Sequence, residues 1–209
     1  MERPAIALFA RAPIPGRVKT RLIGPLSPEQ ACELHRALTR DCWEALESPS
    51  DVYLYTDEEH PEWRALAGPR WRQQRGSNLG ERLWHCFREM QAAGHRPLLI
   101  LGSDAPLTPE LLAPWTGLLA ASPALLGPAE DGGYWAIGCR APHPRMFEGV
   151  EWSSPGTLAQ TVTALERCGL PPAFLPSHYD IDTLQDLRRL AREPRLGVHT
   201  RRWLEGCGL

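Results

Sequence analysis

The stretch Ala5-Ile-Ala-Leu-Phe-Ala10, followed by Arg11-Ala-Pro-Ile-Pro-Gly-Arg-Val-Lys-Thr-Arg-Leu22, decides the fold. Its first six residues are small and apolar without a polar break, which is typical of a strand buried on both faces of a parallel sheet. Two prolines and a glycine then end the strand, because proline cannot donate to a β-ladder and glycine adopts turn conformations that other residues resist. The sequence therefore predicts a central strand over residues 5–10 with a loop directly after it.

The loop after this strand carries only positive charge. Four cations stand within eleven residues, with no acidic residue among them: Arg11, Arg17, Lys19 and Arg21. Guanidinium forks match phosphate oxygens, an ammonium adds a point charge, and Gly16 lets the backbone approach a ligand closely. The loop therefore indicates polyphosphate binding. The alternative is an ordinary solvated basic loop, since the pattern is neither a Walker loop nor G-x-G-x-x-G.

Length and composition limit the possible functions. At 209 residues the chain suits one large domain, and we expect a single domain over residues 1–209. The formal net charge is only −2, so no global field draws the protein to nucleic acid or to an anionic membrane. No apolar run is long enough to span a bilayer, and no cleavage site follows the apolar N-terminal stretch. We therefore expect a cytoplasmic protein that acts on small molecules, as a monomer or a homodimer.

The cysteines are scattered along the chain, without a C-x-x-C pair. This spacing favours free thiols in a reducing compartment over disulfides or a zinc site.

Strand-like and helix-like segments alternate along the chain. After the first strand, further strands are expected at 51–56, 70–74, 97–101, 124–127, 134–139 and 174–181. Helices are expected at 27–46, 59–66, 78–90, 108–119, 155–168 and 183–190. This alternation predicts an α/β fold with a mostly parallel sheet. Ligands of such sheets bind beyond the carboxyl ends of the strands, so the loops after strands 5–10 and 97–101 are expected to form the floor of a site.

An aspartate follows the strand at 97–101, in the sequence Gly102-Ser-Asp104-Ala-Pro106. Its ordinary role would be an Asx turn or a helix cap. Thr108 is already available to cap the next helix, so we expect Asp104 to face the site.

Two more aspartates, Asp180 and Asp182, are separated by one residue. In an extended segment both carboxylates point to the same side while Ile181 goes inward. Two like charges on one side are unfavourable unless a cation lies between them. The alternative, that one of them caps the next helix, is weakened because Thr183 can do so. A Mg²⁺ or Mn²⁺ ion bridging Asp104, one of this pair and phosphate oxygens would account for the acids and the cations together.

The turn Gly127-Pro-Ala-Glu-Asp131-Gly132-Gly133-Tyr134 is the third acidic feature. A small ligand could lie over its glycines, with Asp131 accepting from a hydroxyl or an amine. The alternative is a plain hairpin turn, which the Asp-Gly pair alone favours.

Weaker candidates follow from their position only. Gln74 and Asn78 could line a base pocket or serve as cap residues. Trp152, in Trp152-Ser153-Ser154, could stack on a ligand or be a packing group. None of the histidines has metal-ligand spacing, and His178 is expected to be structural.

Six blocks of the sequence, in order, resemble the DUF2064 family, also labelled the radical-SAM/selenodomain-associated transferase 1 or arsenosugar-biosynthesis glycosyltransferase family. The blocks are Phe-Ala-Arg-Ala-Pro-x-Pro-Gly-Arg-Val-Lys-Thr-Arg-Leu (9–22), Leu-Gly-Glu-Arg (79–82), Gly-Ser-Asp-x-Pro (102–106), Gly-Pro-Ala-Glu-Asp-Gly-Gly-Tyr (127–134), Trp-Ser (152–153) and Asp-Ile-Asp-Thr (180–183). The resemblance covers nearly the whole chain.

That family is similar to the GT-A-like nucleotide-diphospho-sugar transferases, which include guanylyltransferases of molybdenum-cofactor synthesis and phospholactate guanylyltransferases. The resemblance implies a Rossmann-like, GT-A-type three-layer α/β/α sandwich with a mostly parallel mixed sheet, and a nucleotide substrate bound with Mg²⁺ or Mn²⁺.

Site roles are carried over by motif. The resemblance implies phosphate binding by Arg11, Gly16, Arg17, Lys19 and Arg21. From their position alone, Gln74 and Asn78 are expected beside the nucleotide. It implies that Lys19, Arg11 and Asp104 take part in catalysis and that Asp104 is the first metal ligand, with Asp182, or Asp180 in its place, as the second. It implies that the acceptor faces Asp131, Gly132, Gly133, Tyr134, Trp152 and Ser153.

The opening loop departs from the wider superfamily. Nucleotidyltransferases of this fold usually begin with a Leu-Ala-Ala-Gly loop, whereas this chain has Phe-Ala-Arg-Ala between its first strand and the prolines. The donor is therefore left open between a nucleoside triphosphate and a nucleotide sugar. Glycosyltransferases of the superfamily often use D-x-D, but Asp104 is followed by Ala105 and Pro106, which favours nucleotidyl transfer. A third hypothesis is a nucleotide-binding regulatory protein without turnover.

Overall fold

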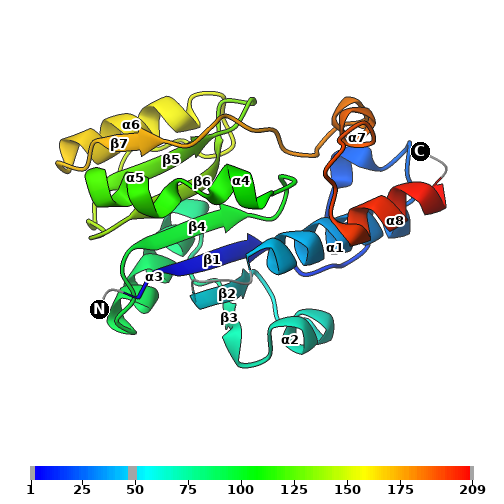
Figure 1. Ribbon diagram of the computed structural model, residues 1–209, viewed down its shortest axis with the longest axis horizontal. Coiled ribbons are helices and arrows are strands. Elements are labelled where there is room, and N and C mark those ends of the chain that lie inside the picture. Colours follow the sequence, from blue (N-terminus) through cyan, green and yellow to red (C-terminus); the bar gives the residue numbers. More distant parts are fainter. Residues whose placement is uncertain (1–2, 47–50, 208–209) are drawn as a thin grey trace.

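One mixed sheet forms the centre of the molecule (Figure 1). The computed structural model describes residues 3–46 and 51–207, and its seven-stranded sheet has the order β3-β2-β1-β4-β6-β5-β7. The strands are β1 (Ala5–Ala10), β2 (Asp51–Thr56), β3 (Trp71–Gln73), β4 (Leu98–Gly102), β5 (Ala124–Pro128), β6 (Tyr134–Cys139) and β7 (Pro172–Phe174). Only β6 runs antiparallel to its neighbours, β4 and β5. The sheet is mostly parallel, as its sequence pattern predicts.

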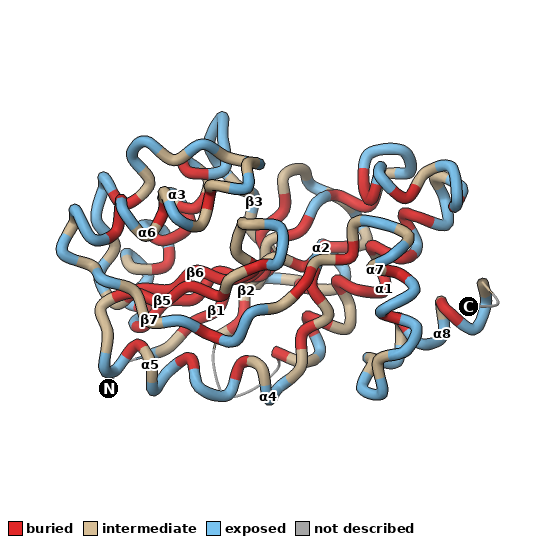
Figure 2. The backbone as a smooth tube through the Cα atoms, turned by 90° about the horizontal axis from the view of Figure 1, so that it is seen from above, coloured by how far each residue is buried: buried red, intermediate tan, exposed pale blue. Residues whose placement is uncertain are grey.

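β1 is buried on both faces because its side chains alternate between two cores. Ile6, Leu8 and Ala10 join one apolar cluster, and Ala5 and Ala7 join the other. β2 and β4 pair with β1 on either side in parallel. Figure 2 shows the buried residues (red) gathered along these strands. The unbroken apolar run at 5–10 is therefore confirmed as a central strand.

Helices cover both faces of the sheet. The first cluster contains residues of α1 (Pro28–Ala45), α2 (Pro61–Ala67), α4 (Pro109–Leu112) and α5 (Trp115–Ala121). The second contains residues of α3 (Leu79–Ala92) and α6 (Thr157–Arg167). A smaller third cluster joins α1 to α7 (Leu184–Leu190) and α8 (Val198–Cys207), at one end of the sheet. The architecture is the predicted three-layer α/β/α sandwich.

Side chains cap several of the helices, among them Thr108 and Thr183 as the sequence predicts. Ser27 and Gln30 form a capping box at α1, and Thr183 and Asp186 form another at α7. The Thr108 hydroxyl accepts from the Leu111 backbone at the start of α4. Because these residues satisfy the helix N-termini, the neighbouring acids Asp104 and Asp182 are not needed as caps.

Two predicted elements differ in the structure, and one observed helix was not predicted. The helix expected over 108–119 is broken into α4 and α5 around Ala113 and Pro114, since proline cannot continue a hydrogen-bonded turn. The strand expected over 174–181 overlaps the short edge strand β7 only at Phe174. Beyond it, Leu175 and His178 still donate to carbonyls of β5, and Ile181 donates to the Asp104 carbonyl at 3.0 Å. The pattern also gave no sign of α8.

The six cysteines lie within the described residues and are all free thiols, as their spacing predicts. Within residues 3–46 and 51–207, no helix combines the length and apolar character needed to cross a membrane.

Candidate functional site

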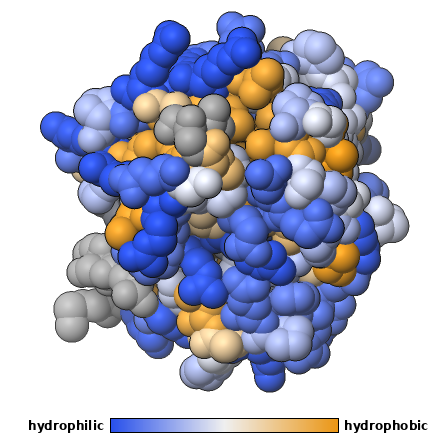
Figure 3. Space-filling model, turned by 90° about the vertical axis from the view of Figure 1, so that its right-hand side faces the viewer, coloured by the Kyte–Doolittle hydropathy of each residue, from blue (hydrophilic) through white to orange (hydrophobic). Residues whose placement is uncertain are grey.

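The strand order reverses between β1 and β4. From β1 the chain builds β2 and β3 on one side, and then returns to place β4 on the other. In sheets of this kind the ligand is expected in a crevice between the loops that leave two such strands, here the loops after β1 and β4. Figure 3 views the end of the molecule that carries α7 and α8, where hydrophilic residues cover most of the surface.

Lys19, from the loop after β1, lies against two of the predicted acids. Its ammonium is 2.5 Å from Asp104 Oδ1 and 3.7 Å from Asp182 Oδ1. The Lys19 side chain is only 2% exposed, whereas the Asp104 side chain is 51% exposed and so remains accessible to a ligand. The Ile181–Asp104 backbone hydrogen bond holds the two acidic segments side by side. The structure thus brings together the positive and negative side chains that the sequence singles out.

The carboxylates are strongly coupled to this ammonium and to one another. Desolvation acts to raise the pKa of Asp104, but the Lys19 ammonium, assisted by His35 and Arg11, outweighs it and holds that pKa below its ordinary value. Desolvation and then the Asp104 charge raise the pKa of Asp180 to about 7. Asp182 adds to that repulsion. The carboxylates of Asp104, Asp180 and Asp182 therefore lie close enough to influence one another.

This cluster of carboxylate oxygens suits a hard divalent cation. Asp104 and Asp182 share Lys19, and Asp180 forms no ion pair with any residue in the described part of the chain. Mg²⁺ and related ions bind one or two carboxylates and complete their shell with phosphate and water oxygens. Asp104, with Asp182 or Asp180, is the donor set that fits.

The other loop cations are divided among different partners. Arg21 pairs with Asp182 at 3.2 Å, and Arg17 pairs with Glu58, in the loop after β2. Arg11 is exposed, and it is the loop cation with no acidic partner among the described residues. Glu58 carries no local signal of its role, because that role depends on the parallel pairing of β1 with β2.

The backbone of the loop is shaped to receive an anion. Gly16 has φ 79° and Lys19, although it is not glycine, has φ 48°. Within residues 3–46 and 51–207, the N–H groups of Gly16, Val18 and Lys19 donate to no backbone or side-chain acceptor. Consecutive N–H groups in such turns form concave anion sites, and a left-handed lysine is the kind of strain that persists at functional sites.

The acidic turn at 129–133 joins β5 and β6 as a hairpin. This is the alternative that the Asp-Gly pair favours. Asp131 Oδ1 accepts from the Gly133 N–H at 2.8 Å. Gly132 has φ 89°, and a Cβ there would lie 2.2 Å from the Pro155 carbonyl oxygen. The Asp131 charge also contributes to the raised pKa of Asp180. Asp131 is therefore both a turn residue and an exposed carboxylate at the rim of the crevice.

Aromatic side chains border this turn. The rings of Tyr134 and Trp152 meet edge to face with centroids 6.5 Å apart, and burial raises the pKa of the Tyr134 phenol. A Cβ at Gly80 would lie 2.8 Å from Trp152, so the Leu-Gly-Glu-Arg and Trp-Ser blocks are in contact. Ser153 is exposed and has φ 61°.

Gln74 and Asn78 are engaged in local structure. Gln74 donates to the carbonyls of Ala10 and Tyr55 at 3.3 and 2.9 Å, tying the ends of β1 and β2 together. Asn78 caps α3 by accepting from the Glu81 N–H at 3.0 Å. The contact of Asn78 matches the cap alternative, whereas that alternative is wrong for Gln74, which joins strand ends instead. A role of either residue beside the nucleotide stays a prediction.

Two other polar features lie outside this crevice. Asp41, Glu44 and His199 gather at the junction of α1 and α8, but Asp41 is occupied with the N–H groups of His199 and Thr200 at the start of α8. Its geometry is that of a helix cap.

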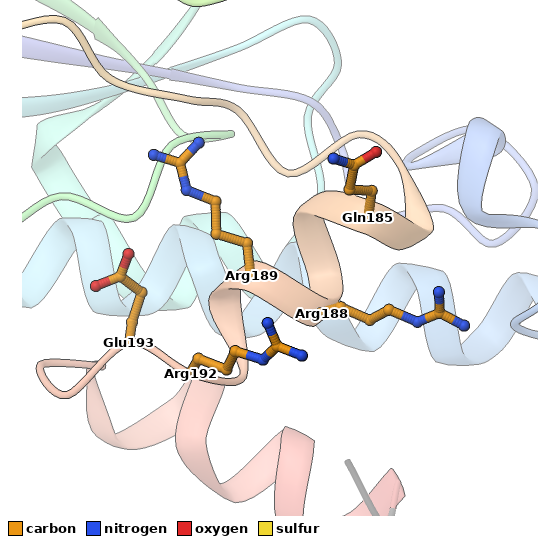
Figure 4. A pocket seen from close by; sticks show the side chains of 5 residues that line it. All are labelled: Gln185, Arg188, Arg189, Arg192 and Glu193. Atoms are coloured by element: carbon orange, nitrogen blue, oxygen red, sulfur yellow. The ribbon is translucent and has the colours of Figure 1, made fainter.

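A hollow of about 380 Å³ beside α7 is lined by Gln185, Arg188, Arg189, Arg192 and Glu193 (Figure 4). Arg188 and Arg189 stand in the last turn of α7, where the helix dipole favours cations. Arg189 points away from its neighbours and pairs with Glu130 at 2.8 Å, next to Asp131. This hollow contains none of the predicted site residues.

A protein family matches more than half of the chain. Residues 36–154 match the family described as "Uncharacterized protein conserved in bacteria (DUF2064)". The chain belongs to the DUF2064 family. The matched range contains the blocks at 79–82, 102–106, 127–134 and 152–153, and the blocks at 9–22 and 180–183 lie outside it. The resemblance to this family is thus confirmed, although no curated protein sequence matches the chain.

Solved structures show the same fold. The DUF2064 protein superposes with a TM-score of 0.90 and 29% identity on a Desulfovibrio desulfuricans G20 protein that is provisionally described as a nucleotide-diphospho-sugar transferase, covering 100% of this chain and 96% of that one. A cytidylyltransferase from Leptospira borgpetersenii is 14% identical with a TM-score of 0.58, covering 100% and 96%. The inositol-1-phosphate CTP transferase from T. maritima is 12% identical with a TM-score of 0.52, covering 98% and 97%. The two distant matches show the fold alone.

Proposed function

We propose that this DUF2064 protein is a metal-dependent transferase with a nucleotide donor, and that it transfers a nucleotidyl group from a nucleoside triphosphate to a small phosphorylated or anionic acceptor. The observation that carries the proposal is the placement of Lys19 between Asp104 and Asp182 at the carboxyl ends of β1 and β4. Such a site can hold a cation and a polyphosphate together, because each offsets the charge of the other.

In this reaction an acceptor oxygen attacks the α-phosphorus and pyrophosphate leaves. A Mg²⁺ or Mn²⁺ ion held by Asp104 with Asp182 or Asp180 supplies a Lewis acid for the phosphoryl oxygens. Arg11 and the N–H groups of the loop after β1 bind the leaving pyrophosphate, and Lys19 keeps the two acidic segments together.

The acceptor enters from the side of the hairpin turn. Asp131 is exposed there and close enough to influence Asp180, and Tyr134 and Trp152 form an aromatic wall beside it. Asp131 can accept a hydrogen bond from an acceptor hydroxyl or amine and so orient it.

The comparisons support the class of reaction. One distant structural neighbour is described as an inositol-1-phosphate CTP transferase and another as a cytidylyltransferase. Both descriptions denote nucleotidyl transfer, so this fold is compatible with that reaction. The test is to incubate the purified protein with each nucleoside triphosphate, Mg²⁺ and a panel of sugar phosphates and other anionic acceptors, and to measure pyrophosphate. Release with at least one pair supports the proposal, and no release with any pair contradicts it.

Glycosyl transfer from a nucleotide sugar is the second candidate. The Desulfovibrio desulfuricans G20 relative, at 29% identity over almost the full length of both chains, is named for that donor class. Calorimetry separates the two, because binding of nucleotide sugars without binding of triphosphates would favour glycosyl transfer. A purely regulatory nucleotide-binding protein would retain its function in Asp104→Asn, which a catalyst would not.

A further inference from the structure

We propose that His35 and Trp63 are positioning residues that hold the loop after β1 ready for polyphosphate, acting through a single backbone carbonyl, that of Arg11. This inference rests on the proposed function, since it assigns a task to residues beneath the same phosphate loop. Neither residue belongs to the sequence blocks that predict the site.

Both side chains donate to the same oxygen. The Arg11 carbonyl lies 3.0 Å from His35 Nε2 and 2.8 Å from Trp63 Nε1. His35 comes from α1 and Trp63 from α2, and their rings meet edge to face at 6.2 Å. His35 is 2% exposed and Trp63 is fully buried. Because a carbonyl has two lone pairs, this arrangement uses both of them.

The N–H of the same peptide group is held from another side. The Ala12 N–H donates to Asp57 Oδ1 at 2.7 Å, and Asp57 lies in the loop after β2. The Arg11–Ala12 peptide is thus fixed by α1, α2 and the loop after β2. The Arg11 guanidinium in turn donates to the Arg17 carbonyl at 3.2 Å, so the position of this peptide also sets the far part of the loop.

A simpler explanation is that buried indole and imidazole N–H groups need an acceptor, and any carbonyl would serve. Two features favour the positioning role. The shared acceptor is the first residue after β1, at the point where the chain turns from the sheet into the cationic loop. The same peptide group is also held through its N–H by Asp57, so three separate elements converge on the start of the loop. Fixing it in advance removes an entropy cost from ligand binding.

A matched pair of tryptophan variants tests this. Trp63→Phe removes the donor to Arg11, whereas Trp43→Phe makes the same change in the same apolar cluster, at a ring that faces Arg70. The probe is inorganic tripolyphosphate with Mg²⁺, measured by calorimetry. We expect Trp63→Phe to weaken binding about tenfold, and Trp43→Phe to stay within about twofold of wild type.

A second readout needs no ligand. Trypsin cleaves after arginine and lysine, so it reports on how often the loop opens. Cleavage within residues 17–22 is expected to be faster in Trp63→Phe than in Trp43→Phe. Equal affinity and equal cleavage in the two variants would overturn the positioning role, even with tight binding by wild type. If wild type bound neither tripolyphosphate nor any nucleotide, the proposed function itself would fail and this inference with it.

Should Trp63→Phe fail to fold, His35 gives the same test. His35→Leu removes the donor and His35→Gln keeps an N–H group on a flexible side chain. Loss of tripolyphosphate binding in His35→Leu with recovery in His35→Gln supports positioning, and equal affinity in both contradicts it.

Discussion

Asp104 is the residue on which the proposed chemistry depends. It follows β4, it touches Lys19, and about half of its side chain remains exposed to the crevice. Its low pKa keeps it ionised at neutral pH, as a metal ligand must be.

We expect Asp104→Asn to reduce pyrophosphate release by at least about 100-fold, because an amide replaces an ionised ligand at the centre of the site. Glu110→Gln is the control, since Glu110 is an exposed acid just beyond the same loop that pairs with Arg195. The control is expected to keep near wild-type turnover under the same assay. Comparable rates for wild type and Asp104→Asn would remove Asp104 from the mechanism.

The raised pKa of Asp180 predicts how the stability of the fold depends on pH. Its pKa is raised to about 7 in the folded protein, so between the ordinary aspartate pKa and pH 7 the folded state binds more protons than the unfolded state. Stability therefore falls as the pH rises through this window. Asp180→Asn abolishes this loss, and we expect it to be more stable than wild type by on the order of 2 kcal/mol at pH 7.5, with little of that gain at pH 4.

Chemical denaturation at both pH values, without divalent metal, measures this difference. A gain from Asp180→Asn that is the same at both pH values would show that the Asp180 carboxyl is not perturbed by its neighbours.

At the scale of elements, the hairpin between β5 and β6 depends on one glycine. Gly132 needs a left-handed backbone and also lies against Pro155, in the segment that follows Trp152. The turn and the Trp-Ser block therefore form one unit beside the proposed acceptor site.

Gly132→Ala and Gly149→Ala separate these two requirements. Both glycines have positive φ, but a Cβ at Gly149 meets nothing within 4 Å. We expect Gly149→Ala to cost about 1 kcal/mol from backbone conformation alone. Gly132→Ala is expected to cost at least about 2 kcal/mol more, because its Cβ forces the Pro155 segment away. Thermal denaturation gives both values, and equal costs would mean that the two segments are not packed as described.

At the scale of the whole molecule, the sequence predicted most of the fold. The apolar runs of β1 and β4 are unbroken because helices cover both faces, and the caps at Ser27, Thr108 and Thr183 are local signals that tertiary structure does not alter. What it could not predict depended on long-range contacts. The segment after β7 bonds first to β5, at Leu175 and His178, and then to Asp104 through Ile181, and no local pattern predicts this change of partner.

Some of the candidate site residues can be picked out from the sequence, and others cannot. The cationic loop and the three aspartates stand out in the sequence because their charges are unusual directly after apolar strands. The residues that support the loop do not stand out. His35 and Trp63 occupy apolar helix faces, and Glu58 has an ordinary polar position, so their roles emerge only when α1, α2 and β2 are assembled around β1.

The most direct test of the whole account is to locate a divalent metal and a nucleotide in the protein. Crystals grown with Mn²⁺ and CTP would reveal the metal by its anomalous scattering. We predict Mn²⁺ bound to Asp104 and to Asp182 or Asp180, with the triphosphate against the loop after β1. Mn²⁺ at Asp41, Glu44 and His199, or a triphosphate in the hollow beside α7, with neither ligand in the crevice, would contradict the account.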